Sequence, residues 1–192
     1  RDSSTSRGLG DVYKRQNYDA LLPVAVEHNY IKEEALEKLK GLFALTLRPN
    51  TMYMESGPVI ETPLSGAQCI HDMLLQSWGG KIRVFPAVPS QWKDVQFQDL
   101  RTEGAFLVSA SREGGKTTGI RIKSLAGEPC ILRTDMVNPI VKAGNVTLTP
   151  IGRGEYSLDL KKGESVVLTT AGDAIPVIGP VDGQGQNFFG LQ

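Results

Sequence analysis

Two carboxylates in a segment rich in proline and glycine are the residues of this chain best suited to catalysis. The segment runs from Tyr53 to Gly66, carries Glu55 and Glu61, and directly precedes a helical pattern. Loops held by a rigid scaffold often carry catalytic side chains. A carboxylate there can serve as a general acid or base, and the dipole of a helix that begins just after Glu61 would keep that side chain ionised, as a base requires. A structural interpretation stays open, in which both acids only bond backbone amides or nearby cations.

Other reactive residue types give weaker signals. The sequence has two histidines, His28 and His71, and lacks a glycine-rich phosphate loop, zinc-ligand spacing and a nucleophile elbow. We interpret both histidines as structural or solvated rather than catalytic. These observations exclude most enzyme classes for the chain itself, and we expect neither a metal nor a cofactor.

Aromatic residues raise a second possibility, sugar binding. Trp92 and Phe97 could stack on a sugar face, although packing in a core or at a domain interface is the favoured interpretation. Two cysteines, Cys69 and Cys130, are expected to be buried free thiols, and one long-range disulfide stays an alternative.

Composition limits the partners. The chain of 192 residues has 21 basic and 21 acidic residues, which gives a net charge of zero and no basic patch for a phosphate backbone, so we do not expect a nucleic-acid partner. Apolar runs fall short of the roughly 18 residues that a membrane-spanning helix needs, so we expect no membrane span.

The elements that must position Glu61 are helical. Apolar residues between Ile31 and Phe43 recur at spacings of three and four, which predicts an amphipathic helix that Pro49 ends. A second helix is predicted from Ser65, as N-cap, through Trp78, until Gly79 and Gly80 stop it.

After Gly80 the hydrophobic period changes to two, and short β-branched runs alternate with turns. The segment from Arg112 to Lys116, with two glycines, predicts a hairpin turn. Seven short strands at regular spacing predict an antiparallel β-sandwich. They are Lys81 to Phe85, Ala105 to Ser111, Thr118 to Leu125, Cys130 to Arg133, Asn145 to Leu148, Tyr156 to Leu160 and Ser165 to Thr169.

Two terminal segments lack a pattern. Residues 1–16 (RDSSTSRGLGDVYKRQ) resemble a translated sequencing-adapter artefact of the kind found in proteins predicted from metagenome assemblies, so we exclude them from the fold and expect the true upstream sequence to be missing. Residues 171–192, with scattered glycine and proline, are expected to form a loosely attached tail.

One stretch carries a family resemblance. Residues Asp72 to Pro89, DMLLQSWGGKIRVFPAVP, resemble the MLLQSHxGxIxLLPALP stretch of glycoside hydrolase family 95, the inverting α-L-fucosidases. Residues Leu100 to Phe106, LRTEGAF, are similar to the LRARGGF run that opens the C-terminal β-domain of that family. The resemblance covers roughly residues 17–170 and implies a bacterial enzyme with an N-terminal β-sandwich, an (α/α)6 barrel and this β-domain, located in the periplasm or outside the cell.

The resemblance also implies a role for Glu61. Counting back from MLLQS places the family's DANFG segment, with its general-base aspartate, on Glu61 to Ser65, so Glu61 takes the base position. Three features depart from the family pattern: Glu replaces Asp, Thr62 and Pro63 replace Ala and Asn, and Trp78 stands where the family usually has His. An extra methylene displaces the carboxylate, so the enzyme's preference can extend to L-galactosides.

We therefore expect an α+β fragment, the last helices of an (α/α)6 barrel followed by an antiparallel β-sandwich. Its parts are an artefact over residues 1–16, an incomplete catalytic barrel over 17–80, the sandwich over 81–170 and a tail over 171–192. The general acid lies upstream, so the fragment alone is expected to be inactive toward its glycan substrate. The alternative is a stand-alone carbohydrate-binding or structural β-sandwich module.

Overall fold

The computed structural model describes residues 32–49, 52–54 and 60–170. It divides after Asp72 into two compact units, one helical and one made of β-strands, and each is described here by itself. The predicted artefact over residues 1–16, the tail over 171–192, His28 and Glu55 lie outside the described residues.

Helix α2 of the first unit spans Lys32–Thr46 and buries Leu36 and Leu39. An ion pair of 2.9 Å joins Glu34 to Lys38 one turn later on the exposed side, a favourable i,i+4 arrangement. The helix ends at Thr46, three residues before the predicted stop at Pro49. Its last turn is closed by the Thr46 hydroxyl, which donates a 2.7 Å hydrogen bond to the carbonyl of Leu42.

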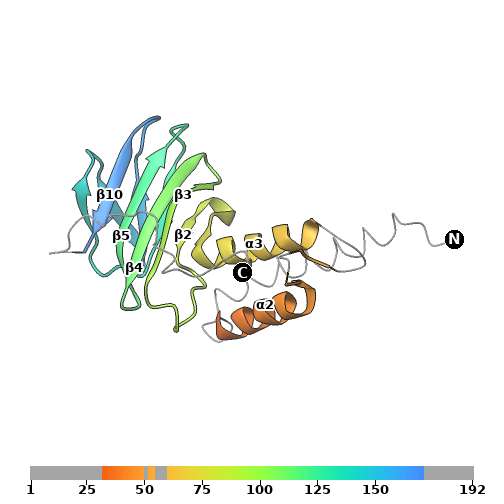
Figure 1. Ribbon diagram of the computed structural model, residues 1–192. Coiled ribbons are helices and arrows are strands. Elements are labelled where there is room, and N and C mark those ends of the chain that lie inside the picture. Colours follow the sequence, from red (N-terminus) through yellow and green to blue (C-terminus); the bar gives the residue numbers. More distant parts are fainter. Residues whose placement is uncertain (1–31, 50–51, 55–59, 171–192) are drawn as a thin grey trace. The chain divides into compact units, whose positions relative to one another are not determined.

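Helix α3 spans Glu61–Leu74, so the predicted start at Ser65 and end at Trp78 were both wrong by four residues. The amide of Leu64 donates a hydrogen bond to the carbonyl of Ile60, and Pro63 lies in the first turn, where its missing N–H costs nothing. Figure 1 shows α2 and α3 side by side and running in opposite directions.

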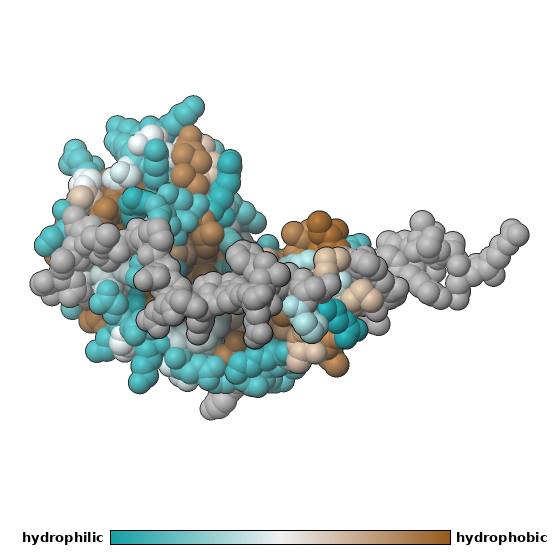
Figure 2. Space-filling view, viewed as in Figure 1, coloured by the Kyte–Doolittle hydropathy of each residue, from teal (hydrophilic) through white to brown (hydrophobic). Residues whose placement is uncertain are grey.

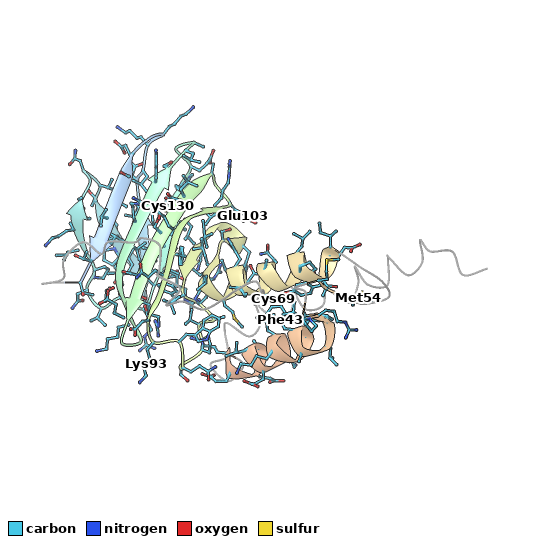
Figure 3. All side chains as sticks on the ribbon, in the orientation of Figure 1. Phe43, Met54, Cys69, Lys93, Glu103 and Cys130 are labelled. Carbon is cyan, nitrogen blue, oxygen red and sulfur yellow. The ribbon has the colours of Figure 1, made fainter. Side chains whose placement is uncertain are left out.

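A glycine allows these two helices to approach closely. A Cβ atom added at Gly66 of α3 would lie 2.7 Å from the ring of Phe43 in α2. Phe43 also contacts Tyr53 edge to face, with the two ring centroids 6.2 Å apart. Figure 3 shows the Phe43 side chain directed toward α3.

The second unit, which we call the β-domain, holds ten strands within its described residues, 73–170. Two short strands are followed by eight longer ones: β1 Leu75–Gln76, β2 Ile82–Val84, β3 Val95–Thr102, β4 Phe106–Glu113, β5 Lys116–Ser124, β6 Cys130–Arg133, β7 Ile140–Ala143, β8 Leu148–Gly152, β9 Glu155–Leu158 and β10 Ser165–Thr169. A single turn of 3₁₀ helix, η1, spans Trp78–Gly80 between β1 and β2.

These strands form two five-stranded sheets, in the orders β1-β2-β6-β9-β8 and β3-β4-β5-β10-β7. We call the first the β6 sheet and the second the β5 sheet. Their inner faces share one hydrophobic core, in which Leu132 and Leu158 of the β6 sheet join Ile122 and Leu168 of the β5 sheet, all at most 1% exposed. The predicted sandwich is confirmed, with one correction: β2 pairs with β6 in parallel, whereas the other described pairs are antiparallel.

The strand predictions succeeded where the alternation is regular. Cys130–Arg133 and Ser165–Thr169 have the predicted bounds, and Gly114 and Gly115, both with positive φ, form the predicted hairpin turn between β4 and β5. The predicted strand from Asn145 to Leu148 was wrong, because the chain there passes from β7 to β8.

Strand β3 was missed altogether. Its register shifts between Phe97 and Leu100, where Asp99 has a φ of 51°, so buried and exposed residues do not alternate along it. A bulge of this kind erases the period of two on which a sequence-based strand prediction depends.

Candidate functional site

Glu61, the predicted base, is the first residue of helix α3 and is exposed, whereas its neighbour Thr62 is buried. The sequence placed it just ahead of the helix, and the structure moves it into the first turn. The geometry is compatible with a base, and the catalytic role of Glu61 stays a prediction.

Of the two histidines, the structure describes His71, which lies on helix α3. His71 of α3 is partly exposed, and its Nδ1 lies 3.8 Å from Oδ1 of Asp72. The same carboxylate accepts a 2.7 Å hydrogen bond from Nε2 of Gln68. Among the residues that the structure describes, no three His, Cys, Asp or Glu side chains gather where they could hold a metal ion.

Both cysteines are free thiols with different environments. Cys130 of β6 is 1% exposed, and burial raises the pKa of its thiol to about 12. Cys69 of α3 is only half-buried. Figure 3 labels both residues.

The aromatic residues predicted to stack on sugar belong to the core instead. Phe97 is 6% exposed and meets Phe85 edge to face, with ring centroids 5.3 Å apart. Trp92 is partly buried against the same core. The interpretation of both as packing residues is therefore confirmed, and they do not form an exposed aromatic strip.

A row of polar side chains crosses the outer face of the β6 sheet. Strand pairing places Gln76 opposite Arg83, Arg83 opposite Arg133, and Arg133 opposite Glu155. Residues directly opposite one another on neighbouring strands point to the same side of a sheet. The neighbouring Leu75, at 0% exposure, points to the opposite side and into the core.

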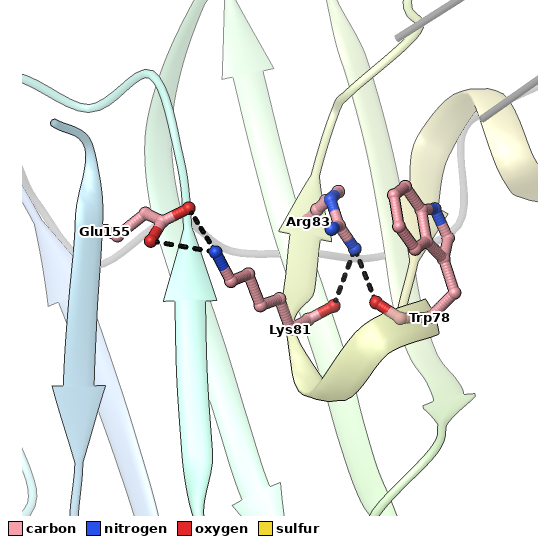
Figure 4. Close-up of polar contacts among 4 residues, drawn as sticks. All are labelled: Trp78, Lys81, Arg83 and Glu155. Carbon is pink, nitrogen blue, oxygen red and sulfur yellow. Dashed lines mark hydrogen bonds and ion pairs between the residues drawn. The ribbon is translucent and has the colours of Figure 1, made fainter. Parts of the chain in front are cut away.

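An exposed tryptophan covers one end of this row. The Arg83 guanidinium lies 3.8 Å from the ring centroid of Trp78, a cation–π contact. Nη1 of Arg83 donates hydrogen bonds to the carbonyls of Trp78 at 2.7 Å and Lys81 at 3.2 Å. The indole Nε1–H donates a 3.0 Å bond to Oε1 of Gln76. Figure 4 shows the indole ring standing against the guanidinium.

An ion pair lies on the other side of Arg83 (Figure 4). Nζ of Lys81 contacts both carboxylate oxygens of Glu155, at 2.9 and 3.1 Å. The hydrogen bond from Lys81 lowers the pKa of Glu155, and the charges of Arg133 and Arg83 act in the same direction. We call the group formed by Gln76, Trp78, Lys81, Arg83 and Glu155 the Trp78 platform.

The sequence prediction missed the Trp78 platform, because it placed Trp78 at the end of a helix. The signal that could have revealed it is Gly79-Gly80 between the pairs Leu75-Gln76 and Ile82-Arg83, which is typical of a hairpin. In the structure both glycines have positive φ, which turns the chain and leaves Trp78 40% exposed.

Residues 76–168 match the model described as glycoside hydrolase family 95, C-terminal domain. The match contains the whole Trp78 platform and begins at its first residue, Gln76. No curated protein matches the chain. None of the helices within residues 32–49 and 60–170 is long and apolar enough to cross a membrane. The β-domain of this chain is therefore similar to the C-terminal domain of glycoside hydrolase family 95, in agreement with a C-terminal fragment that resembles that family.

Proposed function

We propose that this chain is the C-terminal part of an inverting exo-glycoside hydrolase that removes α-L-fucosyl residues, or related L-sugars such as L-galactosyl residues, from glycans. The observation that carries the proposal is the family 95 match over residues 76–168. A hairpin of two helices precedes the matched residues, as the end of an (α/α)6 barrel would.

Glu61 is the general base in this proposal. In an inverting hydrolase the base takes a proton from a water molecule as the water attacks the anomeric carbon, while an acid on the opposite side protonates the departing glycosidic oxygen. The two carboxyl groups stand roughly 6.5 to 9.5 Å apart, which leaves room for the water. The Glu61 carboxylate is exposed in the first turn of α3, so it is accessible to water.

The helical unit has features that agree with an incomplete barrel. Leu45 is 77% exposed, Ile60 70% and Leu64 62%, an unusual degree of exposure for large apolar side chains on a helical hairpin. Figure 2 shows hydrophobic residues at the surface of this unit. Further barrel helices, and the general acid with them, belong upstream in this proposal, so the chain of 192 residues does not hydrolyse glycosides alone.

The experiment is a comparison of variants in the full-length enzyme on an aryl α-L-fucoside. Glu61→Gln removes the basic oxygen with little change in shape, so we expect kcat to fall by about 10²- to 10⁴-fold. Glu61→Asp restores the acid that the family resemblance suggests, and we expect it to retain much of the activity. The matched control is Glu37→Gln, which changes an exposed helix glutamate bonded to Lys40. Full activity of Glu61→Gln would refute the assignment.

A further inference from the structure

We propose that Phe43 of α2 positions Glu61 by holding both ends of the segment that carries this side chain. The segment runs from Tyr53 to Gly66, and the Phe43 ring faces its first and its last residue. We call Phe43, Tyr53 and Gly66 the Phe43 clamp. The inference rests on the proposed function, because it takes Glu61 as the general base, and it gives the clamp a positioning role rather than a chemical one.

At the end of the segment, helix α3 lies close against the Phe43 ring. A Cβ atom at Gly66 would stand 2.7 Å from Cε1 of Phe43 and 3.2 Å from Cζ, whereas carbon atoms in contact normally stand about 3.5–4.0 Å apart. Thr62 and Gly66 are both buried and lie one turn apart on the same side of α3. Glu61 belongs to the same first turns, so its position depends on this close approach.

At the start of the segment, Tyr53 meets the same ring edge to face, with the ring centroids 6.2 Å apart. The backbone of this end is tied to the last turn of α2. Tyr53 forms a β-bridge with Leu47, and the amide of Met54 donates a 2.9 Å hydrogen bond to the carbonyl of Thr46. Figure 3 labels Phe43 and Met54. The start of the segment is therefore held beside Phe43 by the backbone as well as by the ring.

An added carbon atom at Gly66 can be accommodated in two ways. The Phe43 ring can turn aside, which removes its contact with Tyr53 and loosens the start of the segment. Alternatively, α3 can move away from the ring by about 1 Å, the difference between the close approach and a normal contact, and Glu61 then moves with the helix. Both responses displace the base, so the absence of a side chain at Gly66 serves the position of Glu61.

The position of the base matters because of the water molecule that it activates. In an inverting hydrolase this water lies between the basic carboxylate and the anomeric carbon. A displacement of about 1 Å can lower the rate about 10²-fold even when its cause lies away from the reacting atoms. The clamp therefore affects the chemical step more than the binding of the substrate.

The test is a kinetic comparison in the full-length enzyme with an aryl α-L-fucoside. We expect Gly66→Ala to lower kcat about 10- to 100-fold and to change KM by less than about twofold. The matched control is Gly41→Ala, because Gly41 is exposed on α2 and a Cβ there would meet nothing within 4 Å. This control should have the kcat of the parent enzyme.

A second pair of variants tests the other end of the clamp. Tyr53→Leu removes the edge-to-face contact with Phe43, so we expect kcat to fall about 3- to 10-fold. Tyr53→Phe keeps the aromatic ring and should keep most of the activity. Thermal unfolding shows which variants are folded, and Tyr53→Leu replaces Gly66→Ala in the next comparison if the latter does not fold.

A double-mutant cycle distinguishes positioning from general damage. Because the clamp acts through Glu61, Gly66→Ala should lower kcat less than about twofold in an enzyme that already carries Glu61→Gln. An equal loss in both backgrounds, or a folded clamp variant as active as Gly41→Ala, would overturn the positioning role and leave the Glu61 assignment intact. A fully active Glu61→Gln enzyme would overturn the assignment and the positioning role together.

Discussion

At the scale of the residue, Arg83 is a nearly buried cation that packs against the exposed ring of Trp78. It is a charged side chain at 6% exposure, which is costly to bury unless its donors are satisfied. The carbonyls of Trp78 and Lys81 accept from it, and the indole covers its face. The same interactions that satisfy a buried charge therefore hold an aromatic ring in a fixed orientation at the surface.

The Lys81–Glu155 pair makes stability depend on pH. The pKa of Glu155 is lowered in the folded protein, so the pair stabilises the fold above the ordinary carboxyl pKa of about 4.3, and this stabilisation is lost as pH falls through the lower folded pKa. The side chains are 35% and 20% exposed, so we expect Glu155→Gln to cost only about 0.5–1 kcal/mol at pH 7.

Urea unfolding of both proteins from pH 7 to pH 3 measures this dependence. The difference between parent and Glu155→Gln should shrink steadily below about pH 4. Glu128→Gln, at an exposed position between β5 and β6, is the control and should show no such trend. A difference that stays constant down to pH 3 would argue against the ion pair.

The two thiols should differ in reactivity. With a pKa of about 12, only about one in ten thousand Cys130 side chains is a thiolate at pH 8, and burial also blocks reagents. We expect iodoacetamide to label Cys69 of the folded chain well before Cys130, and to label both at similar rates in urea. Peptide mass spectrometry gives the order, and faster labelling of Cys130 in the folded chain would contradict its burial.

At the scale of the element, regular strands could be predicted from the sequence and irregular ones could not. Strand β6 and strand β10 alternate between core and surface, so their bounds followed from the pattern. Strand β3 is bulged at Asp99, and α3 ends before η1, although the sequence predicts a continuous helix through Trp78.

Glu61 could be proposed as the base from the sequence, because both its place in the proline- and glycine-rich segment and the family resemblance favour it. The Trp78 platform was missed because its hairpin was interpreted as the end of a helix, and Glu155 comes beside it only through the pairing of β2 with β6 and of β6 with β9.

One turn between elements gives a sharp test of packing. The position of Gly144, between β7 and β8, has a φ of 103°, and an added Cβ would lie 2.5 Å from the carbonyl oxygen of Ser165 in β10. Gly163 also has a positive φ, 88°, but a Cβ there would meet nothing within 4 Å. An alanine at either position would have to adopt an unfavourable positive φ. Only the alanine at position 144 would also collide with the backbone of β10.

We expect Gly163→Ala to cost about 1–2 kcal/mol in the free energy of unfolding, the penalty of a left-handed residue. Gly144→Ala should cost about 1–3 kcal/mol more, since β10 must move. Urea unfolding followed by circular dichroism compares them. Equal losses for the two variants would mean that the turn after β7 relaxes without disturbing β10.

At the scale of the whole molecule, the two units differ in how completely they bury their apolar residues. The core of the β-domain gathers buried residues from Leu75 to Leu168 in one cluster shared by both sheets. The helical unit leaves Leu45, Ile60 and Leu64 largely exposed. A shared closed core supports independent folding, whereas exposed apolar faces promote association.

We therefore expect residues 73–182, produced alone, to unfold in one cooperative transition and to stay monomeric. The chain of 192 residues should self-associate as its concentration rises, and Leu45→Ser with Leu64→Ser should reduce this association. Light scattering after size exclusion measures the mass, and calorimetry follows unfolding. An associating β-domain, or a monomeric parent chain at all concentrations, would contradict this division of roles.

The most direct test of the central claim is the turnover of an aryl α-L-fucoside by three proteins: the full-length enzyme, its Glu61→Gln variant and the 192-residue chain. The account predicts hydrolysis with inversion by the full-length enzyme, a loss of about 10²- to 10⁴-fold in kcat for the variant, and no turnover by the chain alone. Hydrolysis by the isolated chain, or an unimpaired Glu61→Gln enzyme, would contradict it.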